Sequence, residues 1–271
     1  MVRTLAVIGV GNMASAIISG ISASDIDITK IFLFDKNTDQ YSKFTDCRVP
    51  FSHATSVAEA VEMADYVLLS VKPQNYSDVL AEISCVTEHE KKIYISIGAG
   101  ITSESVSTSL GNACVIRVLP NVPMLIGEGM SVICKNDNAS KDDFDFVCDI
   151  FGSAGSVLLI NEAEMNRIIG VTSSSPAYVF RFINAIYNGA LLQGLCDEGL
   201  LDAICDVVIG SAMMLKGSKD TPEELISRVA SKGGTTEQAL KTLDEHSFDK
   251  IIADAMVACT NRADELGGIK K

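Results

Sequence analysis

Short apolar runs alternate with helical segments through the first 160 residues, and this alternation limits the fold more than any other feature. The runs are rich in β-branched residues and span residues 4–9, 30–35, 66–71, 92–98, 114–119, 130–134 and 156–160. Strands that are apolar throughout are typical of a mostly parallel sheet with helices on both faces. We therefore predict an α/β fold with a doubly wound, mostly parallel sheet in residues 1–160.

The second half of the chain, residues 161–271, has a helical pattern. Residues that favour helix starts stand at Asn161, Ser175, Thr221 and Ser247. The segments 176–193 and 198–216 are apolar on more than one face, as expected for helices that pack against another subunit as well as their own domain. We predict an all-helical C-terminal domain and at least a homodimer.

Composition excludes some classes of function. A formal net charge of −13 argues against a surface for nucleic acid or for an anionic membrane, because both need clustered Lys and Arg. The eight cysteines form no CxxC pair and no Cys/His cluster, so we expect reduced thiols and no metal site. The first residues lack the features of a signal peptide, and no apolar run approaches 18 residues. We therefore expect a cytoplasmic protein.

Directly after the first strand, Gly9, Gly11 and Ala14 form a GxGxxA motif that opens a helix. The first glycine permits a tight turn, the second lets a pyrophosphate approach the backbone, and the small third residue allows close packing of helix on strand. A merely structural glycine turn is the alternative. Placed at the first strand-to-helix turn, the motif favours a Rossmann domain that binds a dinucleotide.

Residues at the ends of later strands bear on the cofactor. Asp35 is typical of NAD binding through the ribose 2′-hydroxyl, whereas Lys36 could pair with the 2′-phosphate of NADP, so the cofactor choice stays open. Lys72, before Pro73, could contact the cofactor or be an exposed loop lysine. The segments 96–104 and 119–123 also end strands, and the second suits packing beside a nicotinamide.

The sequence "SKGGTTEQAL" at residues 231–240 interrupts the helical half. Gly233 and Gly234 free the backbone, and Thr235 with Gln238 has the form of a capping box at a helix start. The N–H groups of such a helix start could hold a small anion. An ordinary capped turn is the alternative.

The absence of lysine and histidine from part of the chain limits the classes of reaction that it can catalyse. The sequence has no lysine between Lys141 and Lys216 and no histidine between His89 and His246. Dehydrogenases of hydroxy acids usually need such a base in the substrate domain. Reduction of a protonated imine needs mainly orientation, an anion anchor and one hydroxyl donor, so an imine reductase fits better.

Five motifs together resemble pyrroline-5-carboxylate reductases. They are, in chain order, "GVGNMA", "SVKPQ", "RVLPNVP", "GVTSSSPAYVF" and "PEELISRVASKGGTTEQALKTLDE". The resemblance implies reduction of 1-pyrroline-5-carboxylate to L-proline with NADPH, with NADH as the alternative cofactor, in the last step of proline biosynthesis. It also implies a Rossmann domain and a helical domain that dimerises.

The resemblance also implies the residues of the site. Residues that would bind the cofactor are Gly9, Gly11, Asn12, Met13, Ala14, Asp35, Lys36, Val71, Lys72, Pro73, Gly98, Ala99, Gly100 and Asn121. Residues that would bind the substrate are Ser175, Ser231, Gly233, Gly234, Thr235 and Thr236. Thr236 is the expected catalytic residue, donating a hydrogen bond to the ring nitrogen.

The sequence departs from the family pattern at three positions. Ser174 replaces a glycine, which is tolerable only if that position has no positive φ, and Val122 replaces a frequent threonine. Asp35 is less usual than a neutral residue and could shift preference toward NADH. The alternatives to the main reading are a reductase of the six-membered cyclic imino acid and a non-catalytic protein that senses a dinucleotide.

Overall fold

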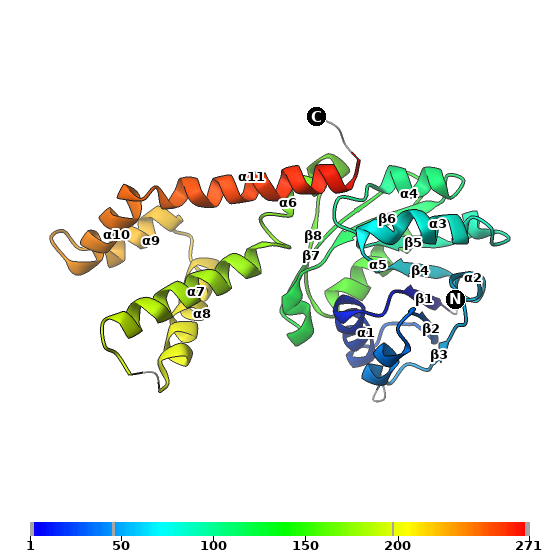
Figure 1. Cartoon of the computed structure of the whole chain (residues 1–271), viewed down its shortest axis with the longest axis horizontal. Helices are drawn as coiled ribbons and strands as arrows, with labels where there is room; N and C mark the ends of the chain where they lie inside the picture. The colour runs from blue at the N-terminus through cyan, green and yellow to red at the C-terminus, as the bar shows by residue number, and fades with distance from the viewer. Residues whose placement is uncertain (1–2, 45–46, 197, 269–271) are drawn as a thin grey trace. The chain divides into compact units, whose positions relative to one another are not determined.

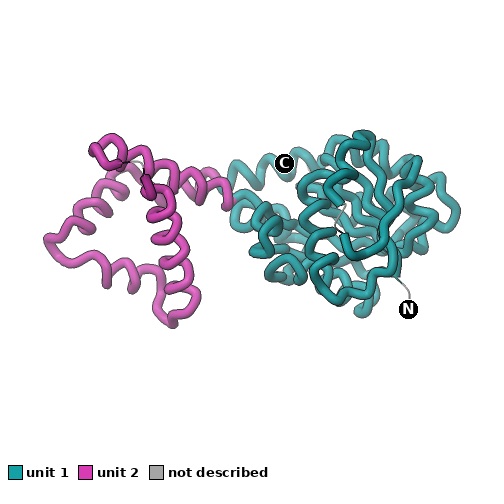
Figure 2. The backbone as a smooth tube through the Cα atoms, turned by 90° about the horizontal axis from the view of Figure 1, so that it is seen from below, with its two compact units in different colours: residues 1–174, 256–271 teal, residues 175–255 magenta. Residues whose placement is uncertain are grey.

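The computed structural model describes residues 3–44, 47–196 and 198–268, which fall into two compact units. Figure 2 shows the first unit, residues 1–174 with 256–271, and the second, residues 175–255. This division differs from the predicted boundary at residue 160. Met165, Ile169 and Ala263 pack in one cluster with side chains of the sheet, which explains why both flanking segments belong to the first unit.

The first unit contains an eight-stranded sheet in the order β3-β2-β1-β4-β5-β6-β7-β8 (Figure 1). All neighbouring strands are parallel except β6 and β7, which confirms the predicted mostly parallel, doubly wound sheet. The strands are β1 (Thr4–Ile8), β2 (Lys30–Phe34), β3 (Phe51–His53), β4 (Tyr66–Leu69), β5 (Ile93–Ser96), β6 (Cys114–Leu119), β7 (Gly129–Lys135) and β8 (Gly155–Leu159).

Helices cover both faces of this sheet. Along β1, Leu5 and Val7 pack with residues of α1 and α5, whereas Ala6 and Ile8 pack with residues of α2, α3 and α4. Alternate residues of a strand point to opposite faces, so both faces of β1 are apolar. The bounds are α1 (Asn12–Ala23), α2 (Val57–Glu62), α3 (Tyr76–Ile83), α4 (Ser103–Ser109), α5 (Lys141–Gly152) and α6 (Met165–Ile168), with 3-10 turns η1 (Thr38–Phe44), η2 (Pro73–Asn75), η3 (His89–Lys91), η4 (Val122–Ile126) and η5 (Glu162–Glu164).

The second unit is helical, as predicted. It contains α7 (Ser175–Leu192), α8 (Leu200–Gly217), α9 (Pro222–Val229), α10 (Thr235–Glu245) and the first residues of α11 (Phe248–Leu266). Capping boxes begin α9 at Thr221 and η5 at Asn161, which confirms two of the predicted starts. Among the described residues, we find no helix that combines the length and apolar character needed to cross a membrane.

Candidate active site

The glycine loop joins β1 to α1 with the geometry that the motif predicts. Gly9 has φ +90°, and a Cβ atom there would lie 2.9 Å from Val71 Cγ1. Gly11, the N-cap of α1, has open space where its Cβ would lie, so another molecule can approach its backbone. Ala14 is fully buried. The unpaired N–H groups of α1 therefore begin at a loop open to a phosphate.

A cavity of about 260 Å³ lies at the carboxyl ends of β1, β2 and β4, where the strand order reverses. Doubly wound folds bind their ligands at this switch point. Six predicted cofactor residues line it, namely Gly9, Gly11, Asp35, Lys36, Val71 and Lys72. The motif did not identify its other polar residues, which are Ser70, Asn75, Asp78 and Glu82. Ser70 lies within the predicted strand 66–71, and the only sequence signal of the other three is that they follow this strand.

The charged groups beside the glycine loop have opposite signs. The Asp35 carboxylate accepts hydrogen bonds from the N–H of Val10 at 2.6 Å and of Asn37 at 2.8 Å, so it holds the end of β2 against the loop. Lys43, which sequence reasoning missed, donates to Asn12 Oδ1 at 3.2 Å. Lys36 is exposed at the cavity. Two cations, Lys36 and Lys43, thus lie near the glycine loop in a chain whose net charge is −13.

The sequence motifs also did not identify Tyr76, whose side chain supports the ends of β4 and β5. Its hydroxyl donates to Leu69 O at 2.8 Å and lies 3.1 Å from Ser96 Oγ. Burial raises the pKa of Tyr76 to about 12, so the hydroxyl keeps its proton at neutral pH. A Cβ atom at Gly98 would lie 2.7 Å from the tyrosine ring, so only glycine lets this backbone pack on it. The Gly98–Gly100 segment lies outside the cavity lining but follows β5 at the same sheet edge.

Asn121 is buried where β6 ends, and both ends of its side chain are engaged. The amide nitrogen donates to Thr172 O at 3.1 Å, and the oxygen accepts from Met130 N at 2.8 Å. This side chain therefore joins three segments of the first unit. Val122, next to it, is half exposed.

The loop before α10 differs from the prediction in its cap. The N-cap of α10 is Gly234 rather than Thr235, because Gly234 takes the extended conformation and Thr235 begins the helix. Gly233 has φ +75°, and its N–H donates to Glu237 Oε2 at 2.7 Å. The Gly234 N–H donates to Ser231 O at 2.9 Å. The first N–H groups of a helix have no intrahelical partner, so those of Thr235 and Thr236 can meet an anion.

Ser175 begins α7, and its neighbour Ser174 resolves one of the departures noted above. Among the described residues other than glycine, only Glu88, Asn112 and Ser247 have a positive φ. Ser174 is not one of them, so a side chain costs no backbone strain at this position.

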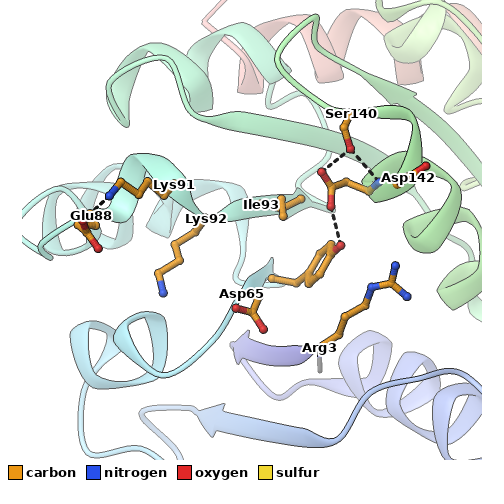
Figure 3. Close-up of a pocket in the computed structure, with 10 residues that line it drawn as sticks. Arg3, Asp65, Glu88, Lys91, Lys92, Ile93, Ser140 and Asp142 are labelled. Atoms are coloured by element: carbon orange, nitrogen blue, oxygen red, sulfur yellow. Dashed lines mark hydrogen bonds and ion pairs between the residues drawn. The ribbon is translucent and has the colours of Figure 1, made fainter. Parts of the chain in front are cut away.

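A larger cavity, of about 820 Å³, lies at the opposite ends of the strands, where β4 and β5 begin. Figure 3 shows Arg3, Lys92 and Asp65 around it, with Ser140 at the start of α5. The Tyr66 hydroxyl donates to Asp143 Oδ1 at 2.7 Å. Burial and this carboxylate raise the pKa of Tyr66 above its usual range. The cavity lies away from the strand ends that carry the glycine loop.

Two family models match the chain. Residues 4–100 match a model described as NADP oxidoreductase, coenzyme F420-dependent, and residues 162–266 match one described as pyrroline-5-carboxylate reductase dimerisation. The first match contains the glycine loop, and the second contains the loop before α10.

Relatives match nearly the whole chain. Pyrroline-5-carboxylate reductase of Escherichia coli is 32% identical over 98% of this chain and 99% of its own length. The enzyme of Pseudomonas aeruginosa is 33% identical over 97% and 96%. The solved structure of Plasmodium falciparum pyrroline carboxylate reductase with NADP bound has a TM-score of 0.87, 25% identity and 98% coverage of both chains. The Streptococcus pyogenes structure has a TM-score of 0.88 at 26% identity, covering 97% and 98%.

Proposed function

Because this chain belongs to the pyrroline-5-carboxylate reductase family, we propose that it reduces 1-pyrroline-5-carboxylate to L-proline, the last step of proline biosynthesis. The observation that carries this proposal is the likeness to these reductases over both units. In the reaction, the imine carbon, which is C2 of the pyrroline ring and becomes C5 of proline, gains a hydride and the ring nitrogen gains a proton, so the C=N bond becomes a single bond. When bound, NADPH supplies the hydride.

The first unit fits a dinucleotide. The open space at Gly11 and the N–H groups at the start of α1 suit its pyrophosphate. Lys36 and Lys43 are the nearby cations that would favour the 2′-phosphate of NADPH. Val71, Lys72 and Pro73 at the end of β4, together with the Gly98–Gly100 loop after β5, would hold the rest of the cofactor.

The loop before α10 suits the substrate. The N–H groups of Thr235 and Thr236 would bind its carboxylate at the positive end of α10, helped by Gly233, Gly234, Ser231 and Ser175. The Thr236 hydroxyl would donate to the ring nitrogen and so orient the imine. For Gly233 to join this site, Glu237 must release its N–H.

We further expect a homodimer formed through the helical unit. Large apolar side chains of α7 and α8 are exposed in the single chain: Phe180 by 61%, Leu192 by 90%, Val207 by 67% and Met213 by 68%. Exposed apolar surface of this kind is typical of subunit interfaces. The eight cysteines are free, which supports a reducing compartment such as the cytoplasm.

The test is to follow NADPH absorbance with purified protein and 1-pyrroline-5-carboxylate, and to identify L-proline as the product. NADH and the six-membered cyclic imino acid serve as matched comparisons, because one methylene alters discrimination by about 1 to 3 kcal/mol. A protein that oxidises no NADPH with either ring would contradict the proposal and favour a dinucleotide sensor. Faster turnover of the six-membered ring would reassign the substrate.

A further inference from the structure

A charged side chain lies inside the sheet region of the first unit, away from the cofactor cavity. Arg117, on β6, is 1% exposed. Its Nη1 donates to Glu162 Oε1 and its Nη2 to Asn166 Oδ1, both at 2.6 Å, while its buried Nε has no hydrogen-bond partner. A buried ion pair with an unsatisfied donor contributes little to stability. Stability alone therefore does not account for Arg117.

Glu162 is the anion that pairs with Arg117. Its second oxygen accepts from the Cys134 thiol at 3.1 Å. Burial acts to raise the pKa of Glu162, but the charge of Arg117 and the hydrogen bonds from Cys134, Arg117 and Ser103 together outweigh it, and the net shift is downward. The pair is therefore ionised at neutral pH and the guanidinium is fixed in place.

The second contact of Arg117 leads to α11. Asn166 accepts from Arg117 and donates through Nδ2 to Asp264 Oδ1 at 2.9 Å. Asp264 lies near the end of α11, where a negative charge is unfavourable for the helix dipole. Asp264 therefore contributes a hydrogen bond to Asn166 and does not stabilise the helix end.

The same turn of α11 packs on the loop after β5. A Cβ atom at Gly100 would collide with Ala263 O, and Gly100 O lies equally close to the Cβ position of Gly267. Backbone therefore contacts backbone here. A shift of the end of α11 toward this loop would displace the Gly98–Gly100 segment, and a shift away would remove the packing against it.

We propose that Arg117, Asn166 and Asp264 form a positioning relay that holds the end of α11 against the Gly98–Gly100 loop and so sets the loop for the cofactor. The role of this loop rests on the proposed function. The relay contacts neither cofactor nor substrate in the proposed site. Arg117, Asn166 and Asp264 are thus positioning residues.

Two variants interrupt the relay in different ways. Asn166→Asp keeps an acceptor for Arg117 but places a carboxylate against Asp264. Asp264→Ala removes the acceptor on α11 and relieves an unfavourable charge at the helix end. Cys134→Ala is the matched control, because it removes a bond to Glu162 and some packing near Ala263 but leaves the Asn166–Asp264 hydrogen bond in place.

The measurements are amide hydrogen exchange of residues 97–101, the dissociation constant of NADPH from nicotinamide fluorescence, and steady-state kinetics. We expect both relay variants to exchange faster in this segment and to raise the KM for NADPH about tenfold. Cys134→Ala should change neither. Unaltered exchange in both relay variants, or an equal effect of Cys134→Ala, would overturn the relay. Faster exchange in a protein without reductase activity would refute the proposed function and leave the relay standing.

Discussion

Thr236 and Glu237 are neighbours at the start of α10 and have opposite expected effects on an anionic substrate. The Thr236 N–H and hydroxyl can attract it, whereas the Glu237 carboxylate already holds the Gly233 N–H at 2.7 Å. Since Gly234 is the cap, the Thr236 hydroxyl is not needed to begin the helix. A substitution at Thr236 should therefore change activity without unfolding α10, so single substitutions can test the function of this loop.

Thr236→Ala should lower kcat while the helix persists. Losing one hydrogen bond made in the transition state costs about 2.7 to 4 kcal/mol in a preorganised site, or roughly 100- to 1,000-fold. Steady-state kinetics with 1-pyrroline-5-carboxylate measure this, and circular dichroism checks the fold. Thr236→Ser, which keeps the hydroxyl, should retain most activity. Full turnover by the alanine variant would rule out the proposed role of the hydroxyl.

Glu237→Gln should lower the KM for 1-pyrroline-5-carboxylate. The glutamine oxygen can still accept the Gly233 N–H, but the negative charge that repels the substrate carboxylate is gone. An exposed charge a few ångströms away predicts a change of about two- to fivefold that shrinks in high salt. Kinetics at two salt concentrations provide the measurement. A raised KM would show that the carboxylate assists binding instead.

Lys36→Ala tests the cofactor choice that Asp35 and Lys36 left open in the sequence. Lys36 is exposed at the cavity, whereas the Asp35 carboxylate is already bound to two backbone N–H groups. Loss of the cation should raise the KM for NADPH about fivefold at low salt and leave that for NADH nearly unchanged. Equal effects on both cofactors would show that Lys36 does not contact the 2′-phosphate.

At the scale of elements, the sequence predicts what local patterns determine. Seven of the eight strands and the glycine loop follow from apolar runs and one motif. The three residues of β3 have too little pattern to detect. The capping box at Thr235 was wrong because the preceding Gly234 takes the cap and Glu237 bonds to Gly233 instead. The return of α11 to the first unit depends on tertiary contacts, which no local pattern contains.

Gly100→Ala tests how closely α11 packs on the loop after β5. Gly100 and Gly127 both have positive φ, +81° and +77°, so alanine strains the backbone at each by about 1 to 2 kcal/mol. Only at Gly100 would the new Cβ meet Ala263 O; at Gly127 it meets open space. Urea unfolding should show a free energy of unfolding lower by about a further 1 to 3 kcal/mol for Gly100→Ala. If Gly100→Ala and Gly127→Ala lose equal amounts of unfolding free energy, the loop after β5 and α11 separate easily.

At the scale of the whole molecule, the acidic net charge affects how anions can bind, and the exposed apolar side chains of α7 and α8 affect how the chain can associate. With a net charge of −13, the chain must bind an anionic substrate and cofactor at local sites such as helix N-termini and lysines. The apolar side chains of α7 and α8 do not form a closed core within the single chain, since many are more than half exposed. Burial by a second copy removes this surface from water and would stabilise the helical unit.

Val207→Glu should therefore weaken the dimer. Val207 on α8 is 67% exposed in the single chain, and a buried carboxylate without a partner costs several kcal/mol in an interface. Met63→Glu is the control, because Met63 is an exposed apolar residue of the first unit, outside the segment that matches the dimerisation model. Analytical ultracentrifugation should find monomer for Val207→Glu at concentrations where the wild type and Met63→Glu remain dimeric. If Val207→Glu stays dimeric at micromolar concentration, this face of α8 is not the interface. Where Val207→Glu is monomeric, its exposed apolar surface lacks a partner, so this monomer should also unfold at a lower temperature than Met63→Glu.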